Sequence, residues 1–331
     1  MRIVALEEHF TIPELVRQID RAVITRRGFP PPEVPWGPMR QVGRLADLGP
    51  DRLADMDAAG ISLQVLSVSG PGADIASPDT APALARAFND ALARVAAGHP
   101  DRYAGFAHLP MTAPDAAADE LERAVTQLGF CGALVNGLTD DCFLDDPRFA
   151  PVLARAEALG TPLYLHPGIP PEAVRRAYYD GLPDPLSFML SIAGWGWHAE
   201  VAVHVLRLVL SGTLDRYPGL QLIIGHMGEG LPAMLARCDQ VFGRAPAGLL
   251  RRSPSQAILE QVHVTTSGFF SLPPFEALLH TFGADRIMFS VDYPFSDNAP
   301  ARAFLDSLPV SPADRQKIAH GNADRLLKLR G

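Results

Sequence analysis

Short, continuously apolar runs alternate along the chain with longer segments in which apolar residues recur every three or four positions. A continuous apolar run is typical of a parallel strand that is covered on both faces. In one of the longer segments Leu84, Phe88 and Leu92 lie four residues apart, which places them on one face of a helix. Eight runs are predicted as strands: Ile3–His9, Leu63–Ser69, Tyr103–Leu109, Cys131–Asn136, Pro162–His166, Leu220–His226, Val262–Ser267 and Arg286–Asp292.

Eight alternating strand and helix units over 331 residues favour an α/β fold of the (β/α)8 TIM-barrel type. We expect residues 1–331 to form this barrel as a single domain, because no linker or repeat divides the chain. The alternative is an open, doubly wound sheet. It is less favoured because no G-x-G-x-x-G motif follows the first strand.

Two connections are too long for ordinary strand-to-helix loops. The first follows strand 1 and contains Gly28–Pro32 and Trp36–Pro38, and the second follows strand 5 and runs from Gly168 to about Trp197. Both leave the carboxyl ends of strands, where such barrels place their active sites, so we interpret them as lids or subunit contacts. Three aromatic side chains in or near these connections are interpreted as core residues or as walls of a substrate pocket: Phe10, Trp195 and Trp197.

Composition narrows the possible partners and location. The chain has 29 Lys and Arg residues against 37 Asp and Glu residues, a net charge of −8, and no basic tract, so no nucleic-acid partner is expected. No run of about 18 uncharged apolar residues occurs and two glutamates interrupt the first apolar run, so neither a membrane span nor a signal peptide is predicted. Three cysteines without a C-x-x-C pair suit a reducing compartment, and the cytoplasm is the expected location.

Polar side chains that can bind a metal ion collect at the carboxyl ends of the predicted strands. Residues two apart in a strand share a face, so Glu7 and His9 can both point into the barrel. His166, His226 and Asp292 end strands 5, 6 and 8. A buried carboxylate or imidazole is costly without a partner, and a cation neutralises that cost. Mixed oxygen and nitrogen ligands suit one divalent ion, Zn or Mn, with positions left open for substrate or water.

Four motifs around these residues extend the pattern: Glu-x-His on strand 1, Leu-His-Pro on strand 5, Gly-His-Met-Gly-Glu on strand 6 and Phe-Ser-x-Asp-x-Pro-Phe on strand 8. In this order the sequence resembles the amidohydrolase superfamily over nearly its whole length. More narrowly, it resembles the metal-dependent, non-oxidative decarboxylases of that superfamily, which include the γ-resorcylate, 2,3-dihydroxybenzoate and aminocarboxymuconate semialdehyde decarboxylases.

The resemblance implies roles for individual residues. The implied metal ligands are Glu7, His9, His166 and Asp292. A second catalytic pair beside the metal is implied at His226 and Glu229. Arg237, on the helix after strand 6, would contact substrate or a neighbouring subunit, and the chain would form a homodimer or homotetramer.

The sequence departs from related proteins at two places. Strand 4 lacks the lysine that bridges two metal ions in many hydrolases of the superfamily, so a site for a single metal ion is expected. After strand 7, Phe269 stands in a stretch where the resorcylate decarboxylases have an asparagine, which implies a more apolar pocket wall.

The leading hypothesis is a carboxy-lyase that acts on a small carboxylic acid, an ortho-hydroxy aromatic acid or a related unsaturated acid. In it, Asp292 protonates the carbon that bears the carboxylate, and His226, positioned by Glu229, polarises the ring hydroxyl. The alternative is a hydrolase or hydratase in which Asp292 activates a water for attack on an ester, lactone, amide or alkene. A third reading is a binding barrel with a structural metal.

Overall fold

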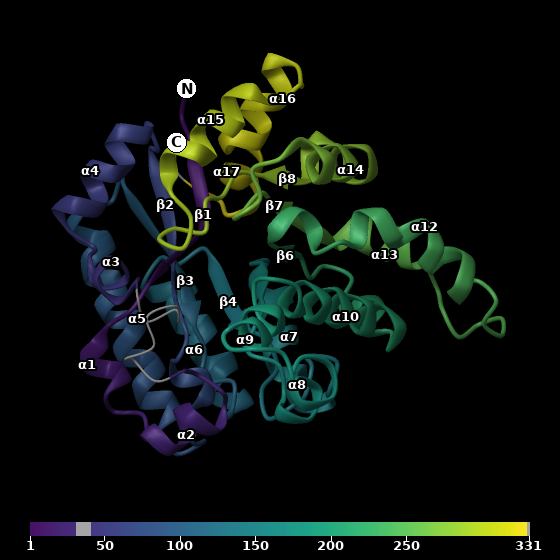
Figure 1. Cartoon of the computed structure of the whole chain (residues 1–331), viewed down its shortest axis with the longest axis horizontal. Helices are drawn as coiled ribbons and strands as arrows, with labels where there is room; N and C mark the ends of the chain where they lie inside the picture. The colour runs from purple at the N-terminus through teal and green to yellow at the C-terminus, as the bar shows by residue number, and fades with distance from the viewer. Residues whose placement is uncertain (31–40, 330–331) are drawn as a thin grey trace.

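The computed structural model describes residues 1–30 and 41–329 (Figure 1). Eight parallel strands form one sheet in which each strand pairs with the next along the chain, from the first to the eighth. The strands are β1 (Val4–Phe10), β2 (Leu63–Val68), β3 (Tyr103–His108), β4 (Gly132–Asn136), β5 (Leu163–His166), β6 (Leu222–Ile224), β7 (Val262–Thr265) and β8 (Ile287–Met288).

Helices surround the strands, as Figure 1 shows. They are α1 (Pro13–Val16), α2 (Arg21–Arg26), α3 (Val42–Ala46), α4 (Pro50–Ala59), α5 (Ala81–Gly98), α6 (Pro114–Gln127), α7 (Ala150–Leu159), α8 (Glu172–Tyr178), α9 (Leu186–Ser191), α10 (Gly196–Leu210), α11 (Thr213–Arg216), α12 (Leu231–Phe242), α13 (Pro254–Gln261), α14 (Leu272–Phe282), α15 (Asn298–Ser307), α16 (Pro312–Gln316) and α17 (Asn322–Leu326). Among the described residues, no helix combines the length and the apolar character that crossing a membrane requires.

The barrel closes differently between β8 and β1 than between the other neighbours. Within the described residues no strand ladder joins this pair. Instead, the His9 amide donates to the Tyr293 carbonyl (2.7 Å), and the Glu7 amide donates to the Ser290 hydroxyl (2.6 Å). The Glu8 carboxylate accepts from the Val291 amide (2.9 Å). We call this junction the seam. The result is a nearly closed eight-stranded barrel ringed by helices, and the predicted (β/α)8 fold is confirmed.

A β-bulge in β1 orients its polar residues. The register against β2 shifts between Ala5 and Glu8, which changes the alternation of side chains along the strand. Val4, before the bulge, and Leu6, within it, belong to the apolar cluster that fills the barrel. Glu7, also within the bulge, approaches His166 and His226 from β5 and β6, and Glu8, after it, contacts the seam instead.

Both long connections carry helices. The connection after β1 contains α1 to α4, and the one from β5 to α10 contains α8 and α9. The predicted features Pro31, Pro32 and Trp36–Pro38 lie outside the described residues.

Two strands are several residues shorter than the sequence predicts. β6 ends at Ile224 and β8 at Met288, although apolar residues continue beyond both. Neither strand can run to its predicted end, His226 or Asp292, because these two residues adopt positive φ angles, 51° and 70°, which a strand does not accommodate.

Candidate functional site

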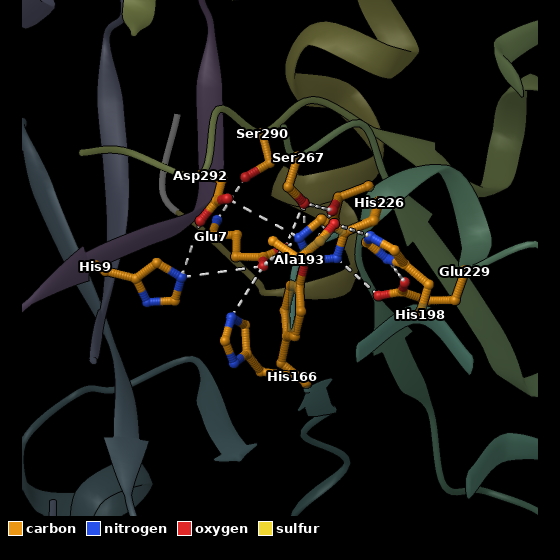
Figure 2. Close-up of polar contacts among 12 residues, drawn as sticks. Glu7, His9, His166, Ala193, His198, His226, Glu229, Ser267, Ser290 and Asp292 are labelled. Carbon is orange, nitrogen blue, oxygen red and sulfur yellow. Dashed lines mark hydrogen bonds and ion pairs between the residues drawn. The ribbon is translucent and has the colours of Figure 1, made fainter. Parts of the chain in front are cut away.

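The carboxyl ends of β1, β5, β6 and β8 bring their polar residues to one place in the barrel mouth (Figure 2). Glu7 lies at the centre. Its Oε1 atom is 3.3 Å from His166 Nε2, 3.6 Å from His226 Nε2 and 4.0 Å from His9 Nε2. Three strands thus aim an imidazole nitrogen at one carboxylate oxygen.

Hydroxyl groups hold the other oxygen of this carboxylate. Glu7 Oε2 accepts hydrogen bonds from Tyr164 and Ser267. Gly225 leaves room for the arrangement, because a Cβ atom there would lie only 2.6 Å from Glu7 Oε2. The Glu7 side chain is therefore fixed with Oε1 pointing toward the histidines.

Two buried atoms at the centre lack a hydrogen-bond partner, Glu7 Oε1 and His9 Nε2. Asp292 Oδ1 lies 3.3 Å from His9 Nε2, and the Ser67 hydroxyl lies 3.2 Å from the other ring nitrogen of His9. Unpartnered buried polar atoms are costly unless a cation or a proton satisfies them. Glu7, His9 and His166 also place one donor atom each within 4.8 Å of one another, so the residues fit a single divalent cation.

Electrostatics at the centre agree with this donor set. Burial raises the pKa of Glu7, but the three neighbouring imidazoles outweigh it, so the pKa lies below its ordinary value and the carboxylate is ionised. Burial lowers the pKa of His166 to about 3, which keeps this ring neutral, as a metal ligand must be. Burial raises the pKa of Asp292, and the His9 ring, whose Nε2 atom lies 3.3 Å from Oδ1, offsets this only in part.

A second group of polar residues adjoins the first. Glu229 Oε1 is 2.7 Å from His226 Nδ1, and Glu229 Oε2 is 2.5 Å from His198 Nδ1. Burial raises the pKa of Glu229, but His226 outweighs it and brings the pKa to about 2. Burial in turn lowers the pKa of His226, but Glu229 outweighs it and raises the pKa to about 10. The pair is therefore an ion pair, with His226 Nε2 facing the metal-binding residues.

Asp292 sits in a strained turn that Glu8 supports. The φ angle of Asp292 is 70°, in the left-handed region that non-glycine residues seldom adopt. The fully buried Glu8 carboxylate accepts from the amides on either side, Val291 (2.9 Å) and Tyr293 (3.2 Å). Arg52, also fully buried, donates to the His9 carbonyl. These contacts fix where the Asp292 side chain enters the site.

A cavity of about 460 Å³ opens beside these residues, and His166 and Asp292 form part of its wall. The rest is largely apolar, with contributions from Phe29, Ile169, Phe188, Met189, Ile192, Trp197 and Phe295. Several of these residues belong to the connection between β5 and α10. The volume suits a single substituted aromatic ring.

The predicted site residues fall into three groups. The structure brings together Glu7, His9, His166, His226, Glu229 and Asp292, with Trp197 in the cavity wall. Phe269 lies against the His226 ring, with centroids 5.9 Å apart. The remaining residues do not line the cavity: Phe10 is fully buried in the core, Trp195 is 60% exposed, and exposed Arg237 donates to Gln240 (2.6 Å).

His198 is a site residue that the sequence reasoning missed. It lies near the start of α10 rather than at the end of a strand, and no motif includes it. Its sequence position could have identified it, because it ends the long connection directly after Trp197, where a pocket wall was expected.

Comparisons with known proteins place this site in a family. The family model for amidohydrolases matches residues 9–329. The chain belongs to the amidohydrolase family. A γ-resorcylate decarboxylase of Rhodococcus jostii is 41% identical over 339 residues, 98% of each chain.

Two solved structures of amidohydrolase-family relatives resemble this one closely. A 2,6-dihydroxybenzoate decarboxylase in complex with 2,6-dihydroxybenzoate has a TM-score of 0.88 and 40% identity, covering 99% of this chain and 100% of its own. A dihydroxybenzoic acid decarboxylase from Polaromonas sp. JS666, with bound manganese and the inhibitor 2-nitroresorcinol, has a TM-score of 0.87 and 37% identity, covering 100% and 98%. The predicted family is confirmed, and so is the prediction of a decarboxylase that uses a divalent metal ion.

Proposed function

We propose that this amidohydrolase removes CO2 from a benzoic acid with a hydroxyl group ortho to the carboxylate, with 2,6-dihydroxybenzoate as the first compound to test. The observation that carries the proposal is the position of Asp292. This acid lines a ring-sized cavity and also lies 3.3 Å from His9, at the edge of the metal-binding residues. A ring whose carboxylate faces Glu7 and the histidines therefore presents its substituted carbon to an acid.

Glu7, His9, His166 and Asp292 are the proposed ligands of one divalent ion, Mn²⁺ in preference to Zn²⁺ because a similar structure holds manganese. When bound, such an ion draws electron density from the carboxylate and hydroxyl oxygens of the substrate and orients them. The apolar side chains of the cavity wall would pack against the ring and reduce its contact with water.

The chain's own residues supply the proton transfers. Asp292 delivers a proton to the ring carbon that bears the carboxylate. The carbon–carbon bond to the carboxylate then breaks, its electron pair restores the aromatic ring, and CO2 leaves. His226, held by Glu229 at 2.7 Å and with Nε2 lying 3.6 Å from Glu7 Oε1, polarises the ortho hydroxyl. A proton from water restores Asp292.

The direct test is CO2 release from a panel of ortho-hydroxybenzoates by the Mn²⁺-loaded enzyme, the chelated enzyme and the enzyme with Mn²⁺ restored. We expect activity in the first and third samples only. Absence of CO2 from every compound would refute the proposal. Incorporation of oxygen from ¹⁸O-labelled water into a product would favour the alternative hydrolase or hydratase, since decarboxylation takes only a proton from water.

Metal analysis of two variants separates the ligand group from the second pair. His166→Ala is expected to lose bound metal, because it removes a nitrogen 3.3 Å from Glu7 Oε1. His226→Asn is expected to keep the metal and lose turnover. Equal metal loss in both variants would instead make His226 a ligand.

We also propose that the chain works as a homodimer or homotetramer. Apolar side chains are exposed on the β5–α10 connection, with Leu186 53%, Met189 48% and Trp195 60% exposed, and a second copy would cover them. Light scattering tests this. The cytoplasm remains the proposed location, supported by three cysteines that are all free, and a fractionated cell extract would check it.

A further inference from the structure

His198 makes two hydrogen bonds that join different parts of the site. Its Nδ1 atom lies 2.5 Å from Glu229 Oε2, and its Nε2 atom lies 3.0 Å from the main-chain oxygen of Ala193 (Figure 2). Ala193 belongs to the connection between β5 and α10, and it lines the cavity. The imidazole therefore spans from the cavity wall to the carboxylate that holds His226.

We propose that His198 is a positioning residue that fixes the Glu229 carboxylate and ties the cavity wall to it. A main-chain carbonyl and an ionised carboxylate only accept hydrogen bonds, so His198 donates from Nε2 to Ala193 and from Nδ1 to Glu229. Both Glu229 oxygens are likewise occupied, one by His226 and the other by His198. Because both oxygens of the Glu229 carboxylate are hydrogen-bonded, the carboxylate cannot rotate freely, and the ring of His226 keeps one orientation.

Aromatic packing adds rigidity to this arrangement. The His198 ring lies edge-to-face against His226 (5.1 Å between centroids) and against Phe269 (5.2 Å). The His198 side chain is 12% exposed, and its bond to Glu229 lies deeper than its bond to Ala193, so water competes least for the bond to Glu229. A substrate ring that presses on Ala193 is thereby linked through one imidazole to the group that polarises its hydroxyl.

The proposal rests on the proposed function and assigns separate kinetic effects to the two contacts. Asparagine places an amide nitrogen near the position of Nδ1, so His198→Asn keeps the donor to Glu229 and loses the one to Ala193. Glutamine places its amide near Nε2, so His198→Gln keeps the contact with Ala193 and loses the one with Glu229. His198→Phe retains a ring and loses both.

The expected result is a split between kcat and KM. His198→Gln should lower kcat about 10- to 100-fold with little change in KM, because a hydrogen bond to a charged group is lost. His198→Asn should raise KM about tenfold and keep most of kcat. His198→Phe should show both effects, whereas His280→Asn, a change at an exposed histidine on α14, should show neither. Equal kinetic changes in the Asn and Gln variants, or wild-type kinetics in the Phe variant, would overturn the proposal.

A double variant tests whether His198 acts through Glu229. In a Glu229→Gln background, His198→Gln should cause no further loss of kcat, whereas a residue that only supports the fold would lower it again. Full additivity would contradict the proposal.

One measurement needs no turnover. In the Zn²⁺-loaded enzyme, which is diamagnetic, proton NMR should show downfield imidazole lines for the hydrogen bonds of Glu229, and the line of His226 should shift in His198→Gln. An unshifted line would overturn the positioning role. If the wild-type enzyme releases no CO2, the proposed function fails while this spectrum still decides the role of His198.

Discussion

Acid should weaken this protein through one buried histidine remote from the metal-binding residues. His204, on α10, is 2% exposed, and its Nε2 atom accepts a hydrogen bond from the Leu144 amide (3.0 Å). Burial lowers the pKa of His204 from 6.5 to about 4, only partly offset by Asp145. The folded protein therefore keeps this ring neutral at a pH where the unfolded chain protonates it.

The size and sign of the effect follow from these values. Because the unfolded chain binds the additional proton, stability is lost as the pH falls below 6.5, and the loss levels off below about 4. The full difference corresponds to about 3 kcal/mol, of which about 2 kcal/mol is lost between pH 7 and pH 5.

The assay is urea unfolding at pH 7 and at pH 5, both with saturating Mn²⁺, of the wild type and of His204→Gln. Glutamine can present an oxygen to the Leu144 amide and does not titrate, so the variant should lose about 2 kcal/mol less over this interval. All other titrating groups are common to both proteins. An equal loss in the two proteins would refute the reasoning, because His204 would then not be the group that takes up the proton.

Three further predictions concern the site. Asp292→Asn should keep the fold, measured by circular dichroism, and lose at least about 10³-fold in turnover, because it removes the proton donor; near-normal turnover would exclude Asp292 from the chemistry. Chelation should lower the melting temperature measured by calorimetry, and Mn²⁺ should restore it, because Glu7 Oε1 and His9 Nε2 are otherwise buried without partners. Arg237→Lys should raise KM or lower kcat in an oligomeric enzyme, because an ammonium cannot reproduce a planar, bidentate contact; unchanged kcat/KM in a monomer would contradict both halves of this expectation.

The sequence was most informative where local rules decide the structure. Continuous apolar runs predicted all eight strands, and the two-residue spacing in β1 correctly placed Glu7 and His9 on one face, where their Oε1 and Nε2 atoms lie 4.0 Å apart. The predicted ends of β6 and β8 were wrong, because His226 and Asp292 have positive φ angles. At Asp292 this turn is held by a distant residue, Glu8, which accepts hydrogen bonds from the amides on either side.

Pocket walls were harder to predict than the residues at strand ends. An aromatic residue in a long connection can face the cavity, as Trp197 does, or the surface, as Trp195 does. The sequence positions of the two tryptophans do not indicate which of them faces the cavity. His198 escaped notice because its partners, Glu229 and Ala193, are brought to it only by the fold.

The spacing between β8 and β1 at the seam can change more readily than the spacing between the other strands. Seven junctions between the described strands are ladders whose spacing main-chain hydrogen bonds set. The eighth combines a main-chain bond from His9 to Tyr293 with contacts through the side chains of Glu8 and Ser290. The acid Asp292 follows β8 on one side of that junction, and Glu7 lies on β1 on the other side. Exchanging the side chains at positions 8 and 290 would therefore alter the separation between proton donor and ligand, and leave the remaining strand pairs in register. Divergence toward acids of different size has a simple route in such a barrel, through two positions that never touch the substrate.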